Sequence, residues 1–147
     1  MRKYVDFGKL SVGESLPSLT KESITKIQLV RYAGASGDFN PIHTDDTEAQ
    51  KAGLKGVIAQ GPLIMGFVGQ AIARWVPKRD LRRFKVRFMG MTYLGDVITV
   101  SASVAEKTKT NDGVRVVCET VAKDQHGQAK LSGQFEVFVP IEEGGGI

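Results

Sequence analysis

Hydrophobic residues recur with two different periods along this chain. Over residues 62–75 they return at every third or fourth position, which predicts a helix that is apolar over most of its circumference and buried in the core. Its two apolar lines are formed by Leu63, Phe67, Ala71 and Trp75, and by Ile64, Val68 and Ile72. Pro62 suits the first position of such a helix, so residues 56–60 are expected to form a short strand or loop before it.

After Pro77 the period changes to two, which is typical of half-buried strands. Four strands are expected, at residues 84–88, 97–104, 114–121 and 129–139. Turn residues at 111–113 (Asn-Asp-Gly) and 125–127 (Gln-His-Gly) separate the later runs, so we predict an antiparallel meander. A long buried helix with a curled antiparallel sheet indicates the α+β class.

The first third of the chain predicts shorter elements. Residues 10–14 suggest an entry strand and turn, and the capping box that begins at Thr25 opens a helix reaching about Ala33. Asp45 is expected to cap another short helix that ends near Gly53. The glycine-rich end, residues 141–147, is expected to be a flexible tail.

Length and composition predict one domain over residues 1–147. A 16.0 kDa chain that is 41% hydrophobic can bury a sizeable core without metals or disulfides. Its single cysteine, Cys118, is expected to fill the core, and residues 1–10 do not resemble a secretory signal, so we expect a cytoplasmic protein. The uncharged stretch 56–73 is nearly long enough to cross a membrane, but Gly61-Pro62 divides it, so no membrane association is expected.

Charge is less informative than hydrophobicity here. The net charge is +4, and the densest basic stretch is residues 78–85. This stretch is typical of a solvated loop and strand start, and the alternative is a landing site for a phosphorylated small molecule. Nucleic-acid binding is not expected, because the positive charge of a nucleic-acid-binding protein would normally be clustered on one face or helix.

Candidate chemistry is concentrated in residues 37–43, Gly-Asp-Phe-Asn-Pro-Ile-His. Asp38 and His43 are five residues apart and would diverge on a helix or a strand. They can converge only if the chain turns between them, and Pro41 favours such a turn by pushing Asn40 out of the helical region. A carboxylate and an imidazole at one place can hold a water and move protons near neutral pH. We therefore predict a site here rather than a structural histidine.

Other side chains do not indicate a metal or cofactor site. No Cys/His set has zinc spacing, and Asp45-Asp46 is better explained as a helix cap than as a metal ligand pair. His126 lies in a polar turn and is expected to be exposed. The sequence contains no phosphate loop and no dinucleotide fingerprint, so no cofactor is expected.

Residues 32–43 closely resemble the hydratase motif of the MaoC-like, (R)-specific enoyl-CoA hydratases. The resemblance continues into residues 10–17, Asp45 and the segment 57–59, and so covers most of the chain. It implies the hot dog fold, in which a curved antiparallel sheet wraps a long central helix. Thioesterases that share this fold usually lack the Asp/Asn/His arrangement.

The resemblance also implies roles for individual residues. Asp38 and His43 would bind one water and act as the acid/base pair, and Asn40 would orient that water or its partners. Gly61 would donate its backbone N–H to the thioester oxygen, which agrees with its place at the start of the central helix, where the helix dipole favours negative charge. Gln60 stands where many members carry histidine; it keeps hydrogen-bonding capacity but cannot take up a proton.

The implied reaction is the reversible hydration of trans-2-enoyl-CoA to (R)-3-hydroxyacyl-CoA, with coenzyme A entering only as part of the substrate. Gln60, Arg82 and Arg83 are predicted to contact that substrate, and an acyl carrier protein is the alternative carrier. A homodimer or higher homo-oligomer is expected. The alternatives are a non-catalytic or partner-dependent hot dog subunit, suggested by Gln60 and expected in a heterodimer with a related chain, and an acyl-CoA thioesterase.

Overall fold

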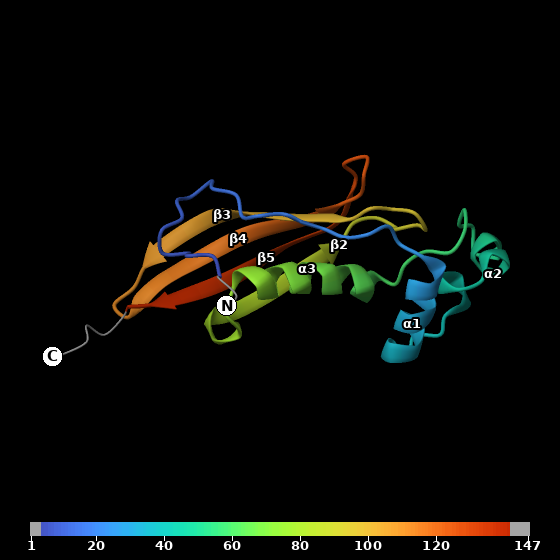
Figure 1. Cartoon of the computed structure of the whole chain (residues 1–147), viewed down its shortest axis with the longest axis horizontal. Helices are drawn as coiled ribbons and strands as arrows, with labels where there is room; N and C mark the ends of the chain where they lie inside the picture. The colour runs from blue at the N-terminus through green and yellow to red at the C-terminus, as the bar shows by residue number, and fades with distance from the viewer. Residues whose placement is uncertain (1–3, 142–147) are drawn as a thin grey trace.

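The computed structural model describes residues 4–141, in which five strands curl around one long helix (Figure 1). The predicted tail therefore lies outside the described residues beyond Ile141. In chain order the elements are β1 (Leu19–Thr20), α1 (Lys26–Ser36), the 3-10 helix η1 (Pro41–His43), α2 (Asp46–Lys51), α3 (Gly61–Trp75), the 3-10 helix η2 (Lys78–Asp80), β2 (Leu81–Phe88), β3 (Thr99–Lys109), β4 (Gly113–Lys123) and β5 (Ala129–Pro140).

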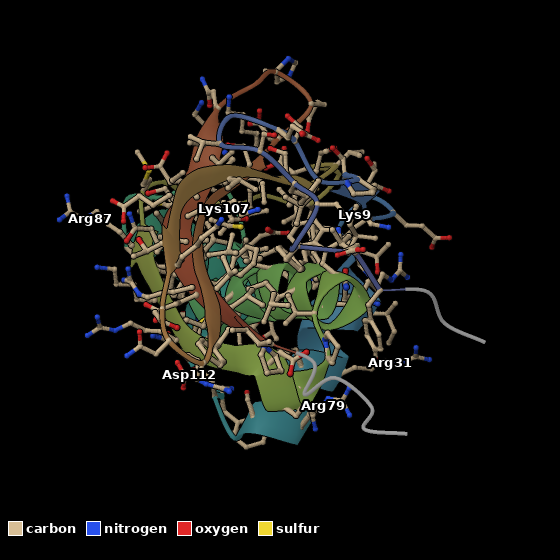
Figure 2. All side chains as sticks on the ribbon, turned by 90° about the vertical axis from the view of Figure 1, so that its left-hand side faces the viewer. Lys9, Arg31, Arg79, Arg87, Lys107 and Asp112 are labelled. Carbon is tan, nitrogen blue, oxygen red and sulfur yellow. The ribbon has the colours of Figure 1, made fainter. Side chains whose placement is uncertain are left out.

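All strand pairs are antiparallel, and the order in the sheet is β1-β3-β4-β5-β2. Viewed along α3, the sheet bends around one side of the helix (Figure 2). The α+β class and the long helix inside a curved antiparallel sheet are thus confirmed. The caps at Thr25 and Asp45 are confirmed as well, since the side chain of each accepts a hydrogen bond from the first turn of its helix.

The predicted order of strands is wrong for β2. Only β3, β4 and β5 form a meander, whereas β2 pairs with β5, with Phe84 opposite Phe135, at the far edge from β3. The connection over residues 89–98 is too long for a tight turn and crosses the sheet past β5 and β4 to reach β3. The entry strand predicted at residues 10–14 is also absent; an isolated bridge joins Ser15 to Ser103 instead.

One face of α3 is buried against the sheet. Trp75 stacks on Phe135 of β5 with ring centroids 5.9 Å apart, and its indole N–H donates to Pro17 O. The buried residues of this helix are Ile64, Phe67, Val68, Ala71, Ile72 and Trp75. The opposite face is exposed and includes Gly66 and Gln70. The prediction of a core helix is confirmed for the face toward the sheet, whereas the opposite face is exposed in the single chain.

Three smaller expectations can be compared with the structure. Cys118 is fully buried, as predicted, and burial raises the pKa of its thiol to about 12. His126 is exposed, as predicted. Over residues 4–141 no helix combines the length and the apolar character needed to cross a membrane.

Candidate active site

The segment that follows α1 makes the turn that the sequence predicts. Helix α1 ends at Ser36 and is capped by Gly37, whose φ of 75° places it in the left-handed region that favours glycine. The backbone N–H of Asn40 then donates to Asp38 Oδ1 (3.2 Å), and the N–H of Ile42 donates to Asn40 Oδ1 (3.3 Å). Asn40 therefore caps η1, and the two side-chain bonds reverse the chain direction.

This turn brings the side chains of Asp38 and His43 together. His43 Nε2 lies 3.4 Å from Asp38 Oδ2, and the exposed fractions of the two side chains are 9% and 42%. On the other side of the ring, His43 Nδ1 lies 2.7 Å from Ile58 O. Because a carbonyl oxygen can only accept, Nδ1 carries the hydrogen, and Nε2 of the neutral ring is left as a proton acceptor facing Asp38.

The carbonyl that orients His43 belongs to a segment held by three successive backbone amides. Val57 N–H donates to Asp46 Oδ1 (3.0 Å), Ile58 N–H to Ile42 O (3.1 Å) and Ala59 N–H to Thr92 O (2.7 Å). Sequence analysis missed these contacts. The sequence offered one signal for them: two aspartates are adjacent at 45 and 46, and a single helix cap needs only Asp45. Asp46 was therefore left without a role.

Gly61 begins α3 three residues beyond Ile58, within about 11 Å along even a fully extended chain. As the first helical residue, it has a backbone N–H with no carbonyl to bond inside the helix. The ring of Phe88 lies over it: a Cβ built at Gly61 would be 3.2 Å from Phe88 Cε1. Glycine thus leaves room for Phe88 close to the first backbone amide of α3, at the positive end of the helix dipole.

Gln60 is fully buried, and its side chain is hydrogen-bonded to α1. Its Nε2 donates to Leu29 O in α1 (3.1 Å), and its Oε1 has no hydrogen-bond partner in the described part of the chain. Gln60 therefore links the start of α3 to α1, and in this structure its side chain is not open to solvent.

The structure does not bring Arg82 and Arg83 to this place. Both lie at the start of β2, after the C-terminal end of α3, whereas β2 reaches Gly61 only at its last residue. Six residues of strand separate Arg82 from Phe88, about 20 Å. Arg82 donates to Arg79 O, and its guanidinium lies 5.5 Å from the centre of the Phe138 ring.

A buried lysine supports the loop beside the site, and sequence analysis missed it as well. Lys130 Nζ donates to Met91 O (2.7 Å) and lies 3.2 Å from Asp124 Oδ2. Burial alone would raise the pKa of Asp124, but hydrogen bonds from Gln128 N–H, Lys130 and His126 N–H outweigh it and lower the pKa below its ordinary value. Through Met91, this ion pair anchors the loop that contains Thr92.

A comparison with known protein families identifies the family of this chain. Residues 9–126 match the MaoC like domain, which includes the turn, both members of the Asp38–His43 pair and Gly61. The chain belongs to the MaoC-like domain family. The resemblance read from residues 32–43 is confirmed.

Individual MaoC-like relatives agree with this assignment. The chain is 29% identical over 138 residues to an (R)-specific enoyl-CoA hydratase from Rhodospirillum rubrum, covering 91% of each. It is 31% identical to the unliganded R-hydratase PhaJ1 from Pseudomonas aeruginosa, with a TM-score of 0.79 over 93% of this chain and 86% of that one. It is also 32% identical over 117 residues to a fatty acid synthase subunit beta from Gibberella zeae, but spans 6% of that protein's length.

Among residues 4–141 of this MaoC-like chain, no three His, Cys, Asp or Glu side chains are grouped so as to hold a metal ion. At the site, the side chains of Asp38 and His43 can exchange protons, and the Gly61 N–H can donate a hydrogen bond.

Proposed function

We propose that this chain is an (R)-specific enoyl-CoA hydratase, which adds water reversibly across the double bond of a trans-2-enoyl-CoA to give the (R)-3-hydroxyacyl-CoA. The observation that carries this proposal is the pair formed by His43 Nε2 and Asp38 Oδ2. The pair lies within the residues that match the MaoC like domain, and relatives of similar length are named R-hydratases.

Asp38 and His43 have distinct roles in the proposed hydration step. A water between them donates one hydrogen to the Asp38 carboxylate, which orients it, and the other to His43 Nε2. As the water oxygen attacks the β-carbon, Nε2 takes the second proton, and the imidazolium then delivers it to the α-carbon on the same face. The bond from Nδ1–H to Ile58 O supports this assignment, because it leaves Nε2 free to accept.

Gly61 is proposed to stabilise the charge that this attack creates. When water adds to the β-carbon, negative charge moves onto the thioester oxygen as an enolate. The backbone N–H of Gly61 would donate to that oxygen, aided by the positive end of the α3 dipole. Pro62 has no N–H, so Gly61 is the residue that can donate there.

We also propose that the active form is a homodimer. The exposed face of α3 carries Gly66 and Gly69, above which the single chain leaves open space. One side of β2 has no neighbouring strand in the described sheet. A second copy covering this helix face and this strand edge would remove both exposed features.

Hydration of crotonyl-CoA by the purified chain tests the proposed function. Loss of the enoyl-thioester absorbance is expected without added metal or cofactor, and the product is expected to be (R)-3-hydroxybutyryl-CoA by chiral analysis. Release of free coenzyme A thiol without a hydrated product would indicate a thioesterase instead. Inactivity across short and long enoyl-CoAs, restored by a related hot dog protein, would indicate a partner-dependent subunit.

A further inference from the structure

The sheet face that points away from α3 carries two basic side chains beside a polar hollow. Lys85 and Arg87 alternate along β2 with Phe84 and Val86, which pack against the core, so the two cations project from the opposite face. Figure 2 shows Arg87 directed away from the molecule on that side. Neither cation forms an ion pair with a described carboxylate.

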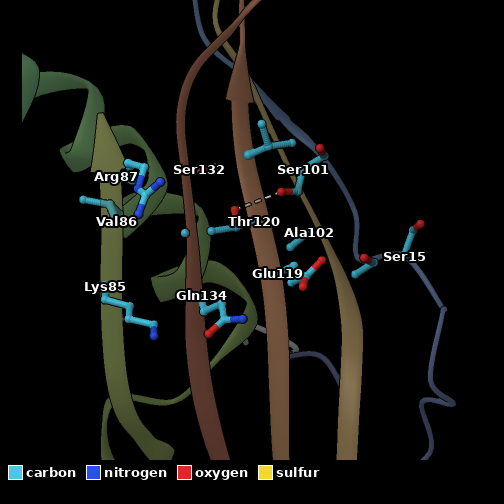
Figure 3. Close-up of a pocket in the computed structure, with 13 residues that line it drawn as sticks. Ser15, Lys85, Val86, Arg87, Ser101, Ala102, Glu119, Thr120, Ser132 and Gln134 are labelled. Atoms are coloured by element: carbon cyan, nitrogen blue, oxygen red, sulfur yellow. Dashed lines mark hydrogen bonds between the residues drawn. The ribbon is translucent and has the colours of Figure 1, made fainter. Parts of the chain in front are cut away.

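The hollow has a volume of about 770 Å³ and crosses β2, β5, β4 and β3 (Figure 3). Lys85 and Arg87 lie along one side, and Ser132 and Gln134 of β5 face them in register. Glu119, the acid that lines the hollow, leans from β4 toward β3 and thus away from the two cations (Figure 3). The β2 side of the hollow is therefore positively charged and rich in hydrogen-bonding groups.

This charged side lies next to the candidate active site at the C-terminal end of β2. Arg87 directly precedes Phe88, whose ring covers Gly61 on the inner face. Lys85 precedes Arg87 by two residues on the same face of β2, about 7 Å along the strand. A ligand bound at Gly61 could thus pass over the end of β2 and reach both cations with a flexible arm.

We propose that Lys85 and Arg87 bind the phosphate groups at the nucleotide end of coenzyme A, with the pantetheine arm passing over the end of β2 to the thioester at Gly61. This inference rests on the proposed function. Arginine matches phosphate with two parallel hydrogen bonds and lysine supplies a point charge, so together they suit a ligand with several phosphates. Ser132 and Gln134 offer hydrogen bonds to the ribose and base.

Substrates with and without the phosphates test this subsite. We compare crotonyl-CoA with the crotonyl thioester of N-acetylcysteamine, which lacks the nucleotide. For Lys85→Gln/Arg87→Gln, the KM for crotonyl-CoA is expected to rise at least about fivefold with kcat unchanged. The reason is that the variant loses two charged hydrogen bonds that bind the ground state and the transition state equally. The kinetics with the truncated thioester are expected to stay at the wild-type values.

The matched control is Lys26→Gln/Lys109→Gln, which removes two exposed cations outside β2 and changes the net charge equally. It is expected to leave the KM for crotonyl-CoA unchanged at 50 mM salt. The effect of the β2 variant should fade as salt is raised, because exposed charges are screened. An equal rise of KM in the control, or for the truncated thioester, would overturn the proposal.

Two further arms separate the outcomes. Calorimetry with adenosine 3′,5′-bisphosphate measures binding at the subsite without turnover. If the wild type binds this ligand and Lys85→Gln/Arg87→Gln binds it more weakly, the subsite is supported even if the chain hydrates neither thioester. If the wild type does not bind it, the proposal is overturned. If Lys85→Gln/Arg87→Gln impairs hydration of crotonyl-acyl carrier protein but not of crotonyl-CoA, Lys85 and Arg87 recognise an acidic protein and the proposal is wrong.

Discussion

His43 Nε2 and Asp38 Oδ2 lie 3.4 Å apart although five positions separate the two residues in the chain. The distance results from a turn in which Asn40 accepts from Ile42 N–H and Pro41 starts a 3-10 helix. On the far side of the ring, Ile58 O selects the hydrogen position on His43. The geometry of the pair thus depends on one local turn and one distant backbone segment.

The contact between Gly61 and Phe88 predicts a coupling between two substitutions. Gly61→Ala adds a methyl group 3.2 Å from the Phe88 ring, which must shift, whereas in a Phe88→Ala background that space is free. Gly61→Ala is therefore expected to lower the free energy of unfolding by about 0.5–1 kcal/mol more in the wild-type background than in the Phe88→Ala background. Urea unfolding of the four proteins in this cycle measures the difference, and strictly additive effects would contradict the contact.

The lowered pKa of Asp124 predicts a pH-dependent contribution to stability. Because the pKa of Asp124 is lower in the native state than in the unfolded chain, its carboxylate stabilises the fold. This contribution is complete at pH values above the ordinary aspartate pKa of about 3.9, and it is lost as the pH falls through the native pKa. Wild type is thus expected to exceed Asp124→Asn in unfolding free energy at pH 6–7 and to lose that advantage toward pH 2–3. A difference that does not change with pH would argue against the ion pair with Lys130.

Burial of Cys118 predicts an inert thiol. With its pKa raised to about 12, roughly one molecule in ten thousand carries the thiolate at pH 8. A thiol-specific reagent is expected to react with the native protein far more slowly than with the protein in denaturant. Rapid reaction of the native chain would mean that β4 opens readily.

The open space above Gly66 predicts the effect of a bulky side chain there. Nothing in the single chain lies within 4 Å of a Cβ at this position, so Gly66→Phe is expected to leave the monomer folded. In the proposed dimer it would obstruct the close approach of a second copy. Light scattering with size separation should show a dimer for wild type and a monomer for Gly66→Phe. If the wild type is also monomeric, the dimer proposal is wrong.

Local features of the fold were predictable because they depend on nearby residues. The caps at Thr25 and Asp45, the start of α3 and the extended nature of β2 to β5 follow from short patterns. The position of β2 beside β5 was not predictable in this way. A meander is the simplest path for successive strands, and no local signal in residues 89–98 reveals that this connection crosses the sheet to reach β3.

The same distinction holds for the site. Convergence of Asp38 and His43 could be inferred from Asn40 and Pro41, since the turn lies between them. The hydrogen bond to Ile58 O and the burial of Gln60 against Leu29 O join segments 15 and 31 residues apart. Such contacts depend on how α1, α3 and the segment 57–59 pack, which the spacing of residues does not specify.

The central claim is that Asp38 and His43 act on one water during hydration, and steady-state kinetics of Asp38→Asn, His43→Gln and the double variant on crotonyl-CoA test it most directly. Each single substitution is expected to lower kcat at least about a hundredfold with the circular dichroism spectrum unchanged, and the double variant should be little worse than either. Single variants that retain near wild-type kcat, on a substrate that the wild type hydrates, would contradict the assignment.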